Sequence, residues 1–407
     1  MSNETFSGAT DSASAERLQM PIPRVDPVRI PEVFAELREE RPVCPISLVT
    51  GDPALLVTRH EDLKHVLTDR EFSRAAVCGE YAPRSQAVRP NPDTIMNMDP
   101  PRHTRIRKLA AQAFSAERLD ALLPRIRRIA DDLMDEMAAM PQPVDLNEAF
   151  SRPLPLRIIC DMLGVPFEDW TRFTDWTETI MTISSTAEQI GAAYVALRTY
   201  FTDLVASKRA NPGDDFLSAL TRQSDAEGAL TESEVISLGT FLLVAGHETS
   251  ATVLTDGVLN LLTHPDQLAD LMADPSLWPG AVEEISRHGI PGVSPFPRIA
   301  MADMTLHGVD IPKGTAMVVN YETALRDPRV YDDPEAFDIR RKQPSQVWFG
   351  HGPHFCLGAP VARMEVEIGL HALFTRFPNL AMAGTTDDLR WKNNAALGGF
   401  EHFLVTW

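Results

Sequence analysis

The chain has 407 residues, of which 44% are hydrophobic and 23% charged, a composition typical of a globular protein large enough to bury a substantial core. Its formal net charge of -19 would repel a phosphate backbone, which argues against nucleic-acid binding. Its four cysteines are scattered with no CxxC pair, which argues against a zinc site or a disulfide framework and favours the reducing cytosol.

The N-terminal residues are polar, and residues 1–22 are predicted to form a flexible tail rather than a signal peptide or membrane anchor. No apolar run reaches the roughly 18–20 residues that a bilayer span needs, so we expect a cytoplasmic protein. Because no linker interrupts the remainder, residues 23–407 are predicted to form a single domain.

The first regular elements are a short apolar run at 52–58, typical of a strand, and a helical segment at 61–69. From about 101 to 270, apolar residues recur at three- and four-residue spacing, which predicts helix almost throughout. Within this stretch, residues 231–263 are predicted to form one long helix. Thr231 with a glutamate three residues later forms a capping box at its start, and His264-Pro265 ends it.

The pattern changes after Pro291. Residues 304–320 alternate between Gly and Pro boundaries and predict short hairpins, whereas 358–376 predicts a last helix and 402–407 a strand. The predicted fold class is therefore mainly α with a minor β part.

The segment 349–360 surrounds Cys356 with glycines and then becomes helical. Backbone N–H groups at a helix N-terminus stabilise a thiolate, and a thiolate is a good ligand for haem iron. The alternative is a buried structural cysteine in a glycine-rich turn.

The spacing F-x-x-G-x-x-x-C-x-G, formed by Phe349, Gly352, Cys356 and Gly358, resembles the cysteine-ligand signature of cytochromes P450. The resemblance covers about residue 25 to the C-terminus and is to the soluble bacterial type. It implies the cytochrome P450 fold, with haem b held between the long central helix and the helix after the cysteine loop. It also implies that Cys356 is the axial ligand of the iron.

The long helix contains Ala245-Gly246-His247-Glu248-Thr249. Glycine and threonine are poor mid-helix residues, and a threonine that bonds the preceding turn opens the helix locally. A kinked core helix with a chance acidic residue is the alternative. The segment resembles the A-G-x-[D/E]-T element of the family, which implies that Ala245 and Gly246 lie beside the haem. It also implies that Thr249 helps to activate dioxygen and that Glu248 helps to deliver protons.

His103 and Arg107 are four residues apart, on one face of a predicted helix that follows two prolines. A solvated basic helix start is the alternative. The resemblance implies that both residues bind haem propionates, together with Arg298 and His354.

Glu284 and Arg287 are three apart on a helical segment and can form an ion pair. A surface pair of little energetic value is the alternative. In the family the pair is structural and is often joined by a further arginine. Here Ala336 stands where that arginine often stands, so Arg340 or Arg341 is expected to replace it.

The resemblance implies a monooxygenase that hydroxylates or oxidatively couples a small hydrophobic molecule, such as a secondary-metabolite intermediate. Ferredoxin and ferredoxin reductase are the expected electron donors, with Arg102, Arg105 and Lys108 as candidate contacts, and a monomer is expected. The expected substrate-pocket residues are mostly apolar: Met96, Met98, Leu242, Leu243, Val293, Ser294, Phe296, Ala396 and Leu397.

Three alternatives remain open: a peroxide-driven haem-thiolate enzyme, a non-catalytic haem sensor and a cysteine hydrolase. The Glu248–Thr249 pair argues against the first, and a sensor would need no proton relay. A hydrolase needs a histidine base near Cys356, and His354 is too close in sequence to be well placed for that role.

Overall fold

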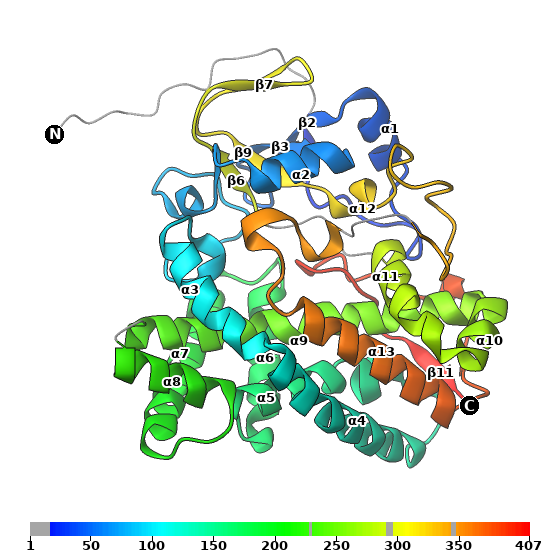
Figure 1. Ribbon diagram of the computed structural model, residues 1–407. Helices are drawn as coiled ribbons and strands as arrows, with labels where there is room; N and C mark the ends of the chain where they lie inside the picture. The colour runs from blue at the N-terminus through cyan, green and yellow to red at the C-terminus, as the bar shows by residue number, and fades with distance from the viewer. Residues whose placement is uncertain (1–16, 228–229, 290–295, 343–346) are drawn as a thin grey trace.

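The computed structural model of the protein describes residues 17–227, 230–289, 296–342 and 347–407 (Figure 1). Its α-helices are α1 (Val33–Glu40), α2 (His60–Thr68), α3 (Arg102–Ala110), α4 (Ala116–Ala138), α5 (Pro153–Leu163), α6 (Trp170–Met181), α7 (Ala187–Ala210), α8 (Phe216–Glu227), α9 (Glu232–Thr263), α10 (Pro265–Ala273), α11 (Trp278–His288), α12 (Tyr321–Ala324) and α13 (Ala359–Arg376).

The strands are β1 (Leu18–Gln19), β2 (Val43–Ser47), β3 (Pro53–Val57), β4 (Phe72–Ser73), β5 (Val144–Asp145), β6 (Arg298–Ala300), β7 (Met304–Leu306), β8 (Val309–Ile311), β9 (Ala316–Val319), β10 (Ala381–Met382) and β11 (Leu404–Thr406). The main sheet has the strand order β1-β2-β3-β9-β6-β4, and β10-β11-β5 form a smaller sheet. The prediction of a mainly helical protein with a minor β part is confirmed.

Helix α9 runs through the middle of the molecule, with the main sheet on one side and most of the other helices around it (Figure 1). It begins as predicted, because the Thr231 hydroxyl accepts from the Glu234 amide at 3.2 Å while the Glu234 carboxylate accepts from the Thr231 amide at 3.0 Å. It ends at His264, where Pro265 opens α10.

The two largest apolar clusters share α9. Its C-terminal half, including Leu254 and Val258, packs with residues of α4, α11 and α13. Its N-terminal half, including Leu238 and Leu243, packs with residues of α5, α6 and α7. Burial of α9 on nearly all sides fixes the position of the residues in its middle turns.

The structure differs from the prediction at two places. Residues 304–320 form only one hairpin, β7–β8, because β9 pairs in parallel with β3 and antiparallel with β6. All four residues of β9 are buried, as expected for an interior strand. The predicted tail, residues 1–22, includes β1, which pairs in parallel with β2, and Met20, which is buried.

Candidate functional site

The cysteine loop joins the 3₁₀ turn Gly352–His354 to the start of α13. The loop is closed by a hydrogen bond from the Cys356 amide to the Phe349 carbonyl, 2.7 Å long. Gly352 has a φ of 70°, and a Cβ atom at this position would lie 2.7 Å from the Thr68 side chain of α2. Glycine is therefore required here on both conformational and steric grounds.

Of the chain's four cysteines, Cys44 and Cys160 are buried and Cys78 is half-buried, whereas Cys356 is exposed as a residue although protein surrounds its sulfur. The surrounding protein raises the pKa of the Cys356 thiol by desolvation. The amides of Gly358 and Ala359 and the Arg107 guanidinium oppose that effect. The predicted amide donors are thus in place, and a cation bound at the sulfur would complete the stabilisation of a thiolate.

Three of the predicted propionate-binding residues lie close together. The rings of His103 on α3 and His354 in the cysteine loop lie 4.1 Å apart, and Arg298 on β6 is buried near them. Burial, with the positive charges of His103, Arg298, Arg74 and Arg107, lowers the pKa of His354 to about 2. Arg298 offers a positive charge and each neutral ring offers one N–H donor, so the residues fit a porphyrin that carries carboxylates.

The fourth predicted residue, Arg107, reaches the cysteine loop itself. Its guanidinium donates to the Phe355 carbonyl at 2.5 Å, and burial lowers its pKa while Cys356 raises it. It therefore connects α3 to the residue directly before the predicted ligand.

Sequence reasoning missed Arg74, which is buried between the segments that carry the site. Its guanidinium donates to the Met96 carbonyl at 2.9 Å, to Asn97 at 2.7 Å and to the Pro297 carbonyl. Burial lowers the pKa of Arg74 to about 10. Arg74 thereby connects the segment before α3, at Met96 and Asn97, to Pro297, the residue before Arg298. No spacing could reveal it, because its partners are 22 to 223 residues away.

The middle of α9 carries the predicted acid and alcohol. The Thr249 hydroxyl donates to the Ala245 carbonyl at 3.1 Å, as the sequence predicted for a threonine that bonds the preceding turn. The Glu248 carboxylate lies 3.6 Å from the His247 ring. Gly246 faces α5, where a Cβ would lie 3.1 Å from Ile159, so close helix packing explains this glycine and its expected place beside the haem stays a prediction.

The Glu284–Arg287 pair is fully buried, and the nitrogen–oxygen distance is 2.7 Å. Arg341 completes the expected arrangement, because its Nε lies 3.1 Å from the same carboxylate. Both arginines also donate to the Ala336 carbonyl at 2.8 Å, whereas Arg340 pairs with Asp270. The network fixes the segment before the cysteine loop to α11.

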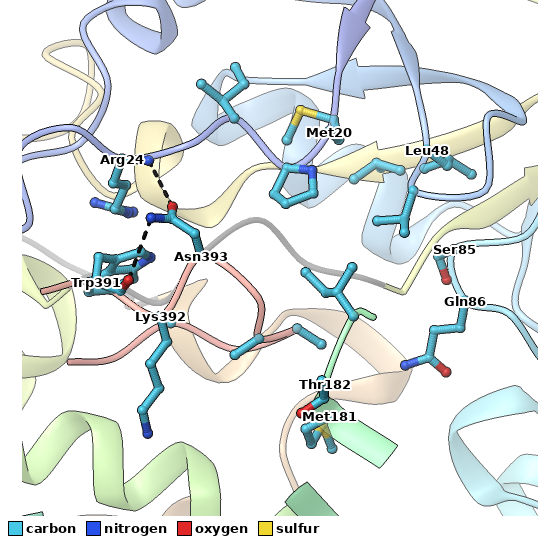
Figure 2. Close-up of a pocket in the computed structure, with 18 of the residues that line it drawn as sticks. Met20, Arg24, Leu48, Ser85, Gln86, Met181, Thr182, Trp391, Lys392 and Asn393 are labelled. Carbon is cyan, nitrogen blue, oxygen red and sulfur yellow. Dashed lines mark hydrogen bonds between the residues drawn. The ribbon is translucent and has the colours of Figure 1, made fainter. Parts of the chain in front are cut away.

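A cavity of about 110 Å³ lies between the N-terminal segment, the end of α6 and the C-terminal loop (Figure 2). Met20 and Leu48 line one side of it and Met181 and Thr182 another. On a third side, the Arg24 amide donates to Asn393, beside Trp391 (Figure 2).

Of the expected pocket residues, Ala396 lines this cavity. Met98, Leu242 and Leu243 are buried in an apolar cluster, and Phe296 is 38% exposed. Val293 and Ser294 lie outside the described residues. The contributions of the N-terminal segment and of α6 were missed, since neither carries a motif.

The candidate basic contacts on α3 are partly neutralised. Arg102 pairs with Asp93 at 2.8 Å, and Arg105 lies 2.5 Å from Glu234, whereas Lys108 is exposed. Within the described residues, none of the helices is both long and apolar enough to cross a membrane.

The family model for cytochrome P450 matches residues 23–211 and 276–396, which include the cysteine loop and the propionate-binding candidates. The chain is a cytochrome P450. Glu248 and Thr249 lie between the two matched segments. The protein is thus a haem-thiolate monooxygenase, an oxidoreductase that uses dioxygen.

Known relatives match the P450 over nearly its whole length. The mycinamicin IV hydroxylase/epoxidase of Micromonospora griseorubida is 39% identical over 396 residues, covering 97% of this chain and 100% of the relative. The nocardicin C N-oxygenase of Nocardia uniformis subsp. tsuyamanensis is 40% identical over 92% of this chain and 94% of the relative. The crystal structure of SgvP, a putative thioether synthase in griseoviridin tailoring, superposes with a TM-score of 0.92 at 40% identity and covers 97% of this chain and 100% of that one.

Proposed function

We propose that this P450 binds haem b through Cys356 and oxidises a hydrophobic secondary-metabolite intermediate. One observation carries the proposal: the Cys356 thiol lies just before α13, in the same loop as His354, whose ring stacks near His103 and Arg298. The thiol provides an iron ligand and these three residues provide partners for two propionates. The haem, when bound, supplies the dioxygen chemistry.

The middle of α9 supplies the proton chemistry in this proposal. The Glu248 carboxyl holds a proton near the Thr249 hydroxyl, and Thr249 passes it on at Oγ1. The Thr249 hydroxyl has its hydrogen directed to the Ala245 carbonyl, so its oxygen lone pairs remain available to accept.

The class of substrate follows from the cavity wall and from the relatives. Met20, Leu48, Ile180 and Met181 make the wall largely apolar, with Asn393 among its polar groups. Two of the relatives named above are a hydroxylase/epoxidase of mycinamicin IV and an N-oxygenase of nocardicin C. We therefore propose a natural product that presents an apolar part with few polar groups to this cavity.

Electrons are proposed to come one at a time from a ferredoxin, which is itself reduced by a ferredoxin reductase. The exposed Lys108 on α3 is the contact best placed to remain available, because Arg102 and Arg105 already pair with acids. The protein is proposed to act as a monomer.

The test is a binding screen that reads the haem spin-state shift over a library of macrolactones, peptides and aromatic polyketides. Compounds that shift the spin state are then incubated with a surrogate ferredoxin system and analysed for oxygenated products. We expect binding to weaken in Ala396→Phe, which fills the cavity, and to persist in Ala383→Phe, a matched change at an exposed alanine. Compounds that bind without electron-dependent oxidation would contradict the proposal and favour a haem sensor.

A further inference from the structure

A hydrogen bond joins α6 to α9 one residue before the catalytic carboxyl. The Thr177 hydroxyl on α6 lies 3.2 Å from Nε2 of His247 on α9. Thr177 is 0% exposed and His247 is 1% exposed. The contact is therefore shielded from water. In the protein interior, a hydrogen bond orients its groups more firmly than at the surface.

The second ring nitrogen fixes the tautomer. Nδ1 of His247 lies 2.9 Å from the Leu243 carbonyl, which can only accept, so Nδ1 carries a hydrogen. In the neutral ring Nε2 is then an acceptor, and the Thr177 hydroxyl is its donor. The Phe173 carbonyl of α6 is an alternative acceptor for the same hydroxyl, at 2.8 Å. The single hydroxyl hydrogen can therefore be donated either to the His247 ring or to the Phe173 carbonyl.

The His247 ring is in turn the neighbour of the Glu248 carboxyl, at 3.6 Å from Nε2 to Oε1. Because Nε2 presents a lone pair, it attracts this carboxyl only when the carboxyl carries the proton that the proposed function gives it. Other charges act on the same region. Lys392 in the C-terminal loop interacts with Glu248, with Glu178 on α6 and with Glu148 and Arg152 before α5. These charges are half-buried or exposed, whereas the His247 ring is held at both nitrogens within the core.

We infer that His247 is a positioning residue for the Glu248 carboxyl and that Thr177 makes this position depend on α6. The inference rests on the proposed role of Glu248 in proton delivery. Ile180 and Met181, within one turn of Thr177, line the cavity. The same hydrogen bond thus connects the wall of the cavity to the proton-donating group.

The test uses carbon monoxide as the probe, because the infrared stretch of the bound molecule reports the electric field and mobility of nearby polar groups without a substrate. Thr177→Val keeps the shape of the side chain and removes the hydroxyl, so the C–O band should shift and broaden. Thr177→Ser should restore the wild-type band. Thr179→Val is the matched control, since Thr179 bonds the Asp175 carbonyl of the same helix at 2.8 Å in the same i−4 pattern.

A double-mutant cycle separates positioning from a structural effect. Thr177→Val should move the band in the presence of Glu248 and leave it unchanged in a Glu248→Ala background. Equal shifts in both backgrounds would overturn the inference, and so would an unchanged band in the single variant.

His247→Phe serves as a second variant, because it keeps an aromatic ring at this position without either nitrogen. It should change the band as Thr177→Val does, and a wild-type band would contradict the inference. The inference fails separately from the proposed function. A carbon monoxide complex without the thiolate-type absorption would refute the proposed ligand. A thiolate-type complex in which Thr177→Val shifts the band equally with and without Glu248 would refute only the role of His247.

Discussion

Thr249 is the residue whose replacement gives the clearest chemical readout. Its hydroxyl donates to the Ala245 carbonyl, which orders it. Thr249 directly follows Glu248, in the part of α9 that is expected to face the haem. Thr249→Ala should lower product formation by on the order of 100-fold, the usual size of a positioned proton-transfer group, and release the reducing equivalents as hydrogen peroxide. Peroxide and product are measured against the electron donor consumed.

Thr249→Ser is the matched control for that prediction, because it keeps the hydroxyl and should retain most of the coupling. Product yield in Thr249→Ala equal to that of the wild type would remove Thr249 from the proton route.

At this same scale, the sequence could predict residues that lie in a spaced motif. Cys356, the His103–Arg107 pair and Thr249 belong to such motifs, and the Thr249 hydrogen bond is confirmed. Arg74 and Thr177 could not be predicted, because each acts through partners that only the fold brings near. Their surrounding residues carry no periodic signal of a polar contact.

At the scale of helices, the contact between α9 and α13 contains a buried acid. Glu365 on α13 is 2% exposed, and its carboxyl hydrogen-bonds to Ser250 on α9. Burial raises the pKa of Glu365 to about 8, and the bond to Ser250 opposes this only in part. The carboxyl is therefore mostly protonated at neutral pH in the folded protein.

This acid predicts a pH dependence of stability. The folded pKa is about 8 and the ordinary value is 4.5, so the folded state binds more protons between these two values. Stability from this group is fully present below about pH 4.5 and is lost as the pH rises through about 8.

The measurement is the free energy of unfolding by urea at several pH values for the wild type and Glu365→Gln. Relative to the variant, the wild type should lose stability between about pH 5 and about pH 8 and then level off. Glu401→Gln, at an exposed position, is the control and should follow the wild type. A difference between wild type and Glu365→Gln that is constant over this range would show that the buried carboxyl does not titrate as described.

Element positions were predicted well where the signal is local. The capping box of Thr231 and Glu234 correctly predicted the start of α9. Pro265 correctly predicted its end. Strand pairing was not predicted, since β9 joins β3 across more than 250 residues and alternation of residue type does not encode the partner.

At the scale of the whole molecule, the site depends on segments from most of the chain. The propionate-binding candidates come from α3, β6 and the cysteine loop, and the proposed proton-delivery residues come from α9. Two apolar clusters share α9, so the packing that stabilises the fold also fixes the acid and alcohol relative to the thiol. The proposal that unites these features is that Cys356 is the iron ligand.

The absorption spectrum of the reduced protein with carbon monoxide tests that proposal most directly. We expect the long-wavelength Soret band typical of thiolate ligation in the wild type and in Cys78→Ala, which changes a cysteine outside the loop. The band should be lost in Cys356→Ala. A histidine-like spectrum in the wild type, or a thiolate band that persists in Cys356→Ala, would contradict ligation by Cys356.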